Sequence, residues 1–202
     1  MQLDIPEGSF QGYLFDCDGT LADTMPLHYL AWIDVLSRHG ANDFFPEEVF
    51  YSLGGVSSLE IISLLNRRHG TQMDPIEVSH EKEAAFMKRL DHVDPITAVL
   101  EYARNKAGLY PLGVVSGGLK PVVHLTLEKI GATELFPVVI TPEDVRYGKP
   151  APDMFLLAAE RLGVDPKHCL VFEDGQSGID GARAAGMSTV WVPSHPYEPI
   201  HP

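Results

Sequence analysis

The sequence predicts an α/β fold with a parallel sheet, and three observations lead to this prediction. From about Asp94 onward, short β-rich runs alternate with helical segments, as in the βα units of a parallel sheet. Each of these helical segments ends at a glycine, a residue that commonly closes helices. Polar side chains follow several of the apolar runs, where open parallel sheets bind their ligands.

Five strands and four helices make up this alternating pattern, and the first strand stands apart from the others. The predicted strands are residues 13–15, 112–115, 138–140, 169–172 and 189–192. The predicted helices are residues 96–107, 121–130, 152–162 and 179–185, closed by Gly108, Gly131, Gly163 and Gly186.

Residues 26–93 have a helical pattern throughout and contain no convincing strand. Ser57 and Glu60 have the spacing of a capping box in front of an apolar helix. Asp74 and Pro75 combine an N-cap with a proline at the first helical position, which opens another helix. Because this block follows the first strand directly, we interpret it as a four-helix lid inserted into the α/β domain.

The domain prediction follows from this insertion. Residues 10–25 and 94–195 are expected to form a discontinuous core, residues 26–93 the lid, and residues 196–202 a tail. Prolines near both crossings restrict the backbone there and could define hinges.

The charge of the chain argues against nucleic-acid and anionic-membrane surfaces, which need clustered Lys and Arg. The 202 residues include 28 acidic and 15 basic ones, for a net charge of −13. The N-terminus has no basic and apolar leader, and no apolar run approaches roughly 18 residues. We therefore expect a cytoplasmic protein, a monomer or weak homodimer, that binds neither nucleic acid nor membrane. Its two cysteines, Cys17 and Cys169, adjoin apolar strands and are expected to be buried free thiols.

Asp16 and Asp18 lie two residues apart, where the first strand breaks into a glycine turn. Side chains alternate with a period of two along a strand, so both carboxylates can face one site. Two carboxylates about 4 Å apart repel by roughly 4 kcal/mol, so the pair needs a cation, a shared proton or separation by the turn. The pair indicates a metal site or acid/base chemistry, although an isolated motif of this kind also fits a solvated turn that caps the next helix.

Three more apolar runs are followed by polar residues: Ser116 after 112–115, Lys149 after 138–140, and Glu173 with Asp174 after 169–172. Their convergence with the aspartate motif at one edge of the sheet argues against coincidence. Taken singly, Lys149 would be a solvated surface lysine, and the two acids would merely suit the start of a helix.

These motifs, in this order, resemble those of the haloacid dehalogenase superfamily, in its branch of small-lid sugar phosphatases and β-phosphoglucomutases. The matching residues are Asp16-x-Asp18-Gly19-Thr20, Ser116, the segment 148–153 around Lys149, Glu173-Asp174, Gly178 and the segment 182–187. The resemblance covers about residues 12–192 and implies a Rossmann-like core with a helical cap, Mg²⁺ dependence and an aspartyl-phosphate intermediate.

The resemblance also implies roles for the acidic residues, with which their chemistry agrees. Asp16 would attack phosphorus and form the covalent intermediate. Asp18 would protonate the leaving alcohol and then activate water. Asp16, the backbone carbonyl of Asp18, Asp174 and Glu173 would form the oxygen-rich environment that Mg²⁺ prefers.

The remaining implied contacts are with the phosphate and the sugar. Ser116, the N–H of Gly117 and Lys149 would hold phosphate oxygens. From the lid, the resemblance suggests that His28 and Gly55 contact the substrate. For His28 a packed core face is an equal alternative, and Gly55 also fits an ordinary turn between helices. Lys82 is a further candidate, for which we favour a solvated helix face.

The leading hypothesis is a Mg²⁺-dependent phosphatase of carbohydrate metabolism that hydrolyses a small sugar monophosphate. A sugar phosphomutase is the alternative, and a non-catalytic phosphosugar-binding protein is disfavoured because the catalytic set is intact. The resembling mutases carry an arginine where this chain has Ser58, and a polar lysine-containing loop where it has residues 117–120. Since a mutase must hold a bisphosphate by both ends, loss of the arginine favours hydrolysis, although Lys120 could compensate in part.

Overall fold

The computed structural model describes residues 1–54 and 56–193. The prediction for Gly55 and the prediction of a tail at 196–202 therefore lie outside the described residues. None of the described helices is both long and apolar enough to cross a membrane.

A five-stranded parallel sheet forms the centre of the structure, with strand order β3-β2-β1-β4-β5. Its strands are β1 (Gly12–Phe15), β2 (Leu112–Val115), β3 (Val138–Ile140), β4 (Cys169–Glu173) and β5 (Ser188–Trp191). The predicted α/β class and parallel sheet are confirmed. Strand β4 extends one residue beyond the prediction because Glu173 still pairs with Trp191 of β5.

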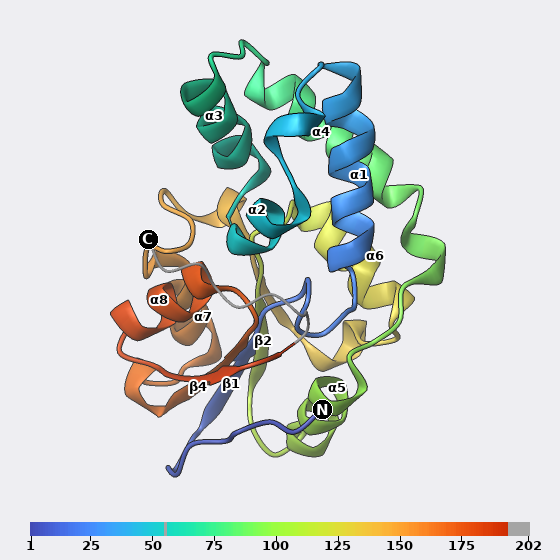
Figure 1. Ribbon diagram of the computed structural model, residues 1–202. Coiled ribbons are helices and arrows are strands. Elements are labelled where there is room, and N and C mark those ends of the chain that lie inside the picture. The colour runs from blue at the N-terminus through green and yellow to red at the C-terminus, as the bar shows by residue number, and fades with distance from the viewer. Residues whose placement is uncertain (55, 194–202) are drawn as a thin grey trace.

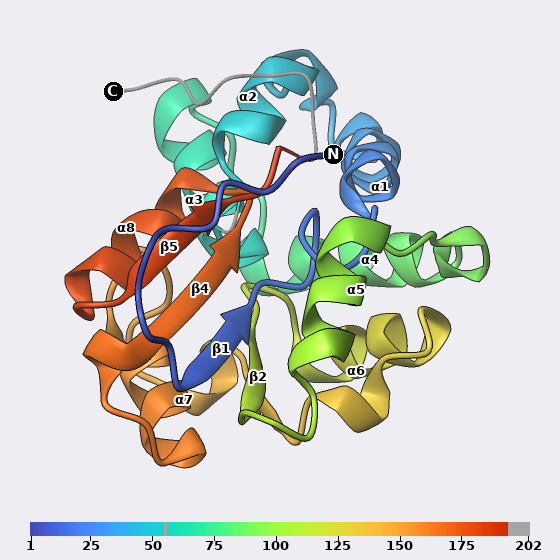
Figure 2. The same ribbon diagram turned by 90° about the horizontal axis from the view of Figure 1, so that it is seen from below.

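Helices cover both faces of this sheet (Figure 2). Helices α5 (Thr97–Lys106) and α6 (Lys120–Lys129) contribute Val99 and Leu127 to the apolar core on one face. Helices α7 (Asp153–Leu162) and α8 (Gln176–Ala184) contribute Phe155 and Ala182 to the core on the other face. Cys17 and Cys169 are buried free thiols within these cores, as predicted.

A group of four α-helices lies above the sheet, on the side where the chain leaves β1 (Figure 1). It consists of α1 (Met25–Arg38), α2 (Glu47–Ser52), α3 (Ser58–His69) and α4 (Pro75–Met87), and we call it the helical group. Its apolar core lies around Trp32, Phe45 and Phe86, and Val122 of α6 joins this cluster. Short 3₁₀ segments complete the chain at Asn42–Phe44, Leu90–His92, Thr133–Leu135, Pro142–Asp144 and Pro166–His168.

Local signals set the ends of these helices as the sequence predicts. The Ser57 side chain accepts a hydrogen bond from the Glu60 N–H at the start of α3. Gly70 ends α3 with a φ of 71°, in the left-handed region that glycine adopts without strain. Asp74 accepts hydrogen bonds from two N–H groups at the start of α4, with Pro75 at its first position.

The two connections between the sheet and the helical group lie side by side. Asp23 N–H donates to the Asp94 carbonyl at 2.9 Å, and Ile96 N–H donates to the Leu21 carbonyl at 2.9 Å. These hydrogen bonds bring the two crossings of the chain to one place.

Candidate active site

The loop after β1 brings its polar residues to the carboxyl end of the sheet through a tight turn. Leu21 and Ala22 both donate backbone hydrogen bonds to the Cys17 carbonyl, which closes the turn. Gly19 has a φ of 83°, and a side chain there would also collide with the Asp174 carboxylate. Glycine is therefore required at this position both by the backbone and by the approach of the Asp174 carboxylate.

Lys149 lies at the centre of the buried charges. Its Nζ is 2.6 Å from Asp16 Oδ1 and 3.0 Å from Glu173 Oε1, and its side chain is fully buried. Burial raises the pKa of Asp16, and the attraction of Lys149 only partly opposes this shift. Burial, followed by the charge of Asp16, raises the pKa of Glu173 well above its usual range. Two buried carboxyl groups therefore share one lysine.

Asp16, Glu173 and Asp174 form a carboxylate cluster in which one oxygen of each lies within 4.8 Å of the others. The second oxygen of Glu173, Oε2, is buried and has no hydrogen-bond partner among the described residues. The Thr20 hydroxyl lies 3.3 Å from Asp174 Oδ1, in hydrogen-bonding range. Three converging carboxylates, two of which share one lysine, and an unpartnered buried oxygen together fit a hard divalent cation.

Asp18 points away from this cluster, although it is only two residues from Asp16. Its Oδ1 accepts a hydrogen bond from the Thr24 hydroxyl at 2.7 Å and lies 3.0 Å from His28 Nε2. Burial tends to raise the pKa of Asp18, but the charge of His28 and the hydrogen bonds outweigh it and lower the pKa to about 2. The turn thus separates the two carboxylates, one of the three solutions that the sequence allowed.

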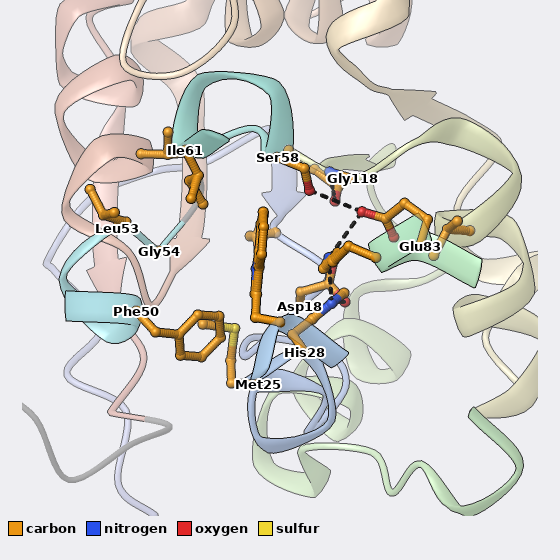
Figure 3. Close-up of a pocket in the computed structure, with 17 residues that line it drawn as sticks. Asp18, Met25, His28, Phe50, Leu53, Gly54, Ser58, Ile61, Glu83 and Gly118 are labelled. Atoms are coloured by element: carbon orange, nitrogen blue, oxygen red, sulfur yellow. Dashed lines mark hydrogen bonds and ion pairs between the residues drawn. The ribbon is translucent and has the colours of Figure 1, made fainter. Parts of the chain in front are cut away.

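A chain of buried polar contacts continues from Asp18 into the helical group (Figure 3). His28 Nδ1 lies 2.8 Å from Lys82 Nζ, which lies 2.9 Å from Glu83 Oε1. The Ser58 hydroxyl donates to the same Glu83 oxygen at 3.1 Å.

Lys82 is only 4% exposed, so the prediction that it lies on a solvated helix face is wrong. Its helix buries a stripe that includes Val78 and Phe86, and the lysine belongs to that stripe.

His28 is packed in the helical group and also borders the cavity described below. Its ring stacks on Phe86 with 3.6 Å between ring centroids, so it is part of the packed core of the helical group. Its two nitrogens face Asp18 and Lys82, so its edge is polar and belongs to the site.

Ser116 directly follows β2. It is fully buried, and its Oγ accepts a hydrogen bond from the Gly118 N–H at 3.1 Å. Ser116, Gly117 and Gly118 precede α6, whose first turn offers N–H groups that favour anions. Lys120 instead pairs with Asp144 at 2.6 Å and does not line the cavity described next.

One cavity lies between the end of the sheet and the helical group. Its floor includes Asp16, Asp18, Ser116 and the two glycines that follow Ser116. Its other polar lining comes from His28, Ser58, Lys82 and Glu83, and its apolar lining includes Met25, Trp32, Phe50 and Leu53. Met25, Phe50 and Leu53 lie on the side opposite Ser58 and Glu83 (Figure 3).

Sequence reasoning did not single out Thr24 as the partner of Asp18, or Glu83 as a cavity residue. The buried stripe of α4 was the available signal for Glu83, which lies four residues after Ser79 and three before Phe86 and so shares their face. For Thr24 the available signal was its spacing of four residues from His28, which places both on one helix face.

The chain is similar to known hydrolases over most of its length. The family profile described as haloacid dehalogenase-like hydrolase matches residues 10–186. Fructose-1-phosphate phosphatase YqaB of Escherichia coli (strain K12) is 36% identical over 184 residues, which cover 91% of this chain and 96% of that protein. Hexitol phosphatase A of the same organism is 36% identical over 192 residues, which cover 90% of this chain and 82% of that protein.

Solved structures share the fold at lower sequence identity. The β-phosphoglucomutase from Clostridium difficile has a TM-score of 0.77 at 22% identity, and the match covers 89% of this chain and 83% of that one. A hydrolase from Pseudomonas syringae has a TM-score of 0.83 at 23% identity, with 93% and 87% covered.

Proposed function

The chain belongs to the haloacid dehalogenase-like hydrolase family, and we propose that it is a Mg²⁺-dependent phosphatase that hydrolyses a small sugar monophosphate through an aspartyl-phosphate intermediate. The observation that carries this proposal is the placement of Asp16 on the cavity floor. Its Oδ1 contacts Lys149, it adjoins two further carboxylates, and Asp18 lies two residues away on the same floor.

Asp16 is proposed as the nucleophile. A carboxylate can attack phosphorus and divide one difficult displacement into two easier ones. Lys149, 2.6 Å away, opposes the rise in the pKa of Asp16 caused by burial and so favours its ionised, nucleophilic form. The same lysine would attract the phosphate as a point charge.

Asp18 is proposed as the acid that protonates the leaving oxygen and then as the base that activates water. With a pKa of about 2, it is ionised in the described arrangement and must first gain a proton to act as an acid. His28 Nε2 lies 3.0 Å from Asp18 Oδ1 and holds the carboxylate in position from one side. Thr24 holds the carboxylate in position from the other side.

Asp16, Asp174, Glu173 and the backbone carbonyl of Asp18 are proposed to hold Mg²⁺. When bound, the ion would offset the charge of the nucleophile and the phosphate together. On the cavity side, Ser116 and the N–H of Gly117 are proposed to bind phosphate oxygens at the start of α6.

The substrate class is proposed from the cavity and from two relatives. The relatives named fructose-1-phosphate phosphatase YqaB and hexitol phosphatase A are both 36% identical to this chain. An apolar side with Trp32 and Phe50 and a polar side with Lys82 and Glu83 suit the faces and hydroxyls of a sugar. We propose that residues 26–93 form a lid that closes over it, with hinges at the two crossings and with His28 and Lys82 near the sugar. A substrate contact from Gly55 also stays a prediction.

Hydrolysis is favoured over phosphomutase activity by the charges around the cavity. A mutase holds a second phosphate, for which bidentate arginine contacts are well suited. In this chain, Ser58 occupies the position of that arginine and donates to Glu83. Lys120 is engaged by Asp144 and cannot serve as a substitute without breaking that pair.

The test is a screen of the purified protein with Mg²⁺ against a panel of hexose, pentose and hexitol monophosphates, with released phosphate and isomerised product both measured. We expect phosphate release from at least one sugar monophosphate without isomerisation, and no release by a folded Asp16→Asn variant. Conversion of glucose 1-phosphate to glucose 6-phosphate faster than phosphate appears would overturn the proposal in favour of a mutase.

A further inference from the structure

A buried ion pair lies in the wall of the cavity, on the helical group. Lys82 and Glu83 are 4% and 5% exposed, and their charged groups are 2.9 Å apart. Both line the cavity, next to Ser58 and His28. Removing two charges from water is costly, so an ion pair at this depth calls for an explanation beyond stability.

The ion pair sets the net charge of the cavity wall on the side of the helical group. Among the described residues, Lys82 is the only lysine or arginine that lines this cavity. Glu83 offsets its positive charge directly and is itself ionised, because the attraction of Lys82 and His28 outweighs the effect of burial and lowers the pKa of Glu83. A second anionic group on a bound substrate would therefore meet a carboxylate rather than an unpaired cation.

Glu83 also has unused hydrogen-bonding capacity. Its Oε1 accepts from both Lys82 and Ser58, whereas Oε2 is buried and has no hydrogen-bond partner among the described residues. An ionised carboxylate only accepts hydrogen bonds, so the group that would satisfy Oε2 is a donor. Since Glu83 lines the cavity, the hydroxyl of a bound polyhydroxylated molecule is the donor that the site would take in.

We propose that Glu83 is a specificity-determining residue that selects neutral, hydroxyl-rich leaving groups and excludes those that carry a second anionic group. This inference rests on the proposed phosphatase function and adds the chemical class of the leaving group. Glu83 acts in two ways: it accepts hydrogen bonds from the sugar, and it keeps Lys82 from binding an additional phosphate or carboxylate. Both actions contribute to the discrimination between leaving groups, so removing either one should weaken it.

The test compares one sugar with and without a second phosphate. The kcat/KM for phosphate release is measured with fructose 1-phosphate and with fructose 1,6-bisphosphate, in the wild-type protein and in Glu83→Gln. We expect the variant to lose about tenfold on the monophosphate and to gain about tenfold on the bisphosphate, because one charge-assisted hydrogen bond is lost and Lys82 becomes available. A structural defect alone would lower both values.

Two further variants isolate the cause. Glu77 lies on the exposed side of the same helix, so Glu77→Gln removes the same charge outside the cavity and should leave the ratio unchanged. The double variant Lys82→Met/Glu83→Gln leaves no buried unpaired charge at this pair and should abolish the gain on the bisphosphate. A gain that persists in the double variant would overturn the role given to Lys82.

The outcomes separate this inference from the proposed function. Hydrolysis of sugar monophosphates with the same substrate ratio in wild type and Glu83→Gln would overturn only the role of Glu83. Absence of phosphate release from every phosphomonoester by the wild-type protein would overturn the proposed function and the inference with it. Wild-type activity that is greater on the bisphosphate than on the monophosphate would also refute selection by Glu83.

Discussion

The contact between Asp18 and His28 should be energetically strong, and a double-mutant cycle can measure it. The pKa of Asp18 falls from 3.8 to about 2, with His28 as the main opponent of burial. Each pKa unit corresponds to about 1.4 kcal/mol, so the shift represents about 2–3 kcal/mol of stability. Since 18% of the Asp18 side chain is exposed, water screens part of this attraction, and we expect a coupling energy of about 1–2 kcal/mol.

The cycle consists of His28→Asn, Asp18→Asn and the double variant, each unfolded by urea. It cancels the loss of ring stacking between His28 and Phe86, which occurs in both variants that lack His28. A lowered pKa stabilises the fold above the unfolded value of 3.8 and loses that effect as the pH falls toward 2. The measurement therefore belongs near pH 6, where Asp18 is ionised in both states.

The His39 and Glu81 pair is the matched control for this cycle. Its atoms are 3.3 Å apart, but its side chains are 28% and 29% exposed. Exposed pairs contribute about 0–1 kcal/mol, so the control cycle should give the smaller coupling. A coupling energy between Asp18 and His28 within about 0.3 kcal/mol of zero would refute the electrostatic link between them.

Three further perturbations test separate parts of the site. Mg²⁺ at a hundred times its dissociation constant should stabilise the wild-type protein by about 2.7 kcal/mol in thermal unfolding. The Asp174→Asn variant should lose most of this stabilisation. Equal stabilisation of the two proteins would show that Asp174 does not bind the metal. Lys149→Met leaves Asp16 and Glu173 without their shared cation, and urea unfolding should show a loss of about 3–5 kcal/mol; a loss below about 1 kcal/mol would contradict the buried pairing. Ser177→Ala removes the 2.7 Å hydrogen bond from α8 to the Gly54 carbonyl, which lies between α2 and α3. If the helical group is a lid, KM should rise more for a sugar phosphate than for an aryl phosphate. Equal changes in KM would argue against a lid that closes over the sugar.

Much of the fold was predictable because local signals agreed with the global arrangement. Alternating β-rich and helical segments gave the parallel sheet, and strands β2 and β3 have the predicted bounds. The spatial order of the strands was not predicted, because crossovers place β1 between β2 and β4 and no local pattern encodes that choice. Helix α6 begins at Lys120, one residue before the predicted Pro121.

The candidate site was predictable where residues follow strands, and less so where they lie on helices. Strand ends are brought together by the sheet, so Asp16 and Glu173 could be placed near each other from the sequence. Lys82 and Glu83 carry charges that usually indicate a solvated face, and their burial depends on partners far away in the sequence, His28 and Ser58. The helix pattern can indicate a buried stripe on α4, but it does not identify these distant partners.

The central claim is that Asp16 carries the phosphoryl group during turnover, and trapping that intermediate tests it most directly. Asp18→Asn leaves the nucleophile in place but removes the base for the second step, so a substrate with a good leaving group should load the enzyme faster than water unloads it. After rapid acid quench and digestion, mass spectrometry should find one phosphoryl group on the peptide that contains Asp16. Released phosphate at the wild-type rate without such a peptide, or phosphorylation of another residue, would contradict the account.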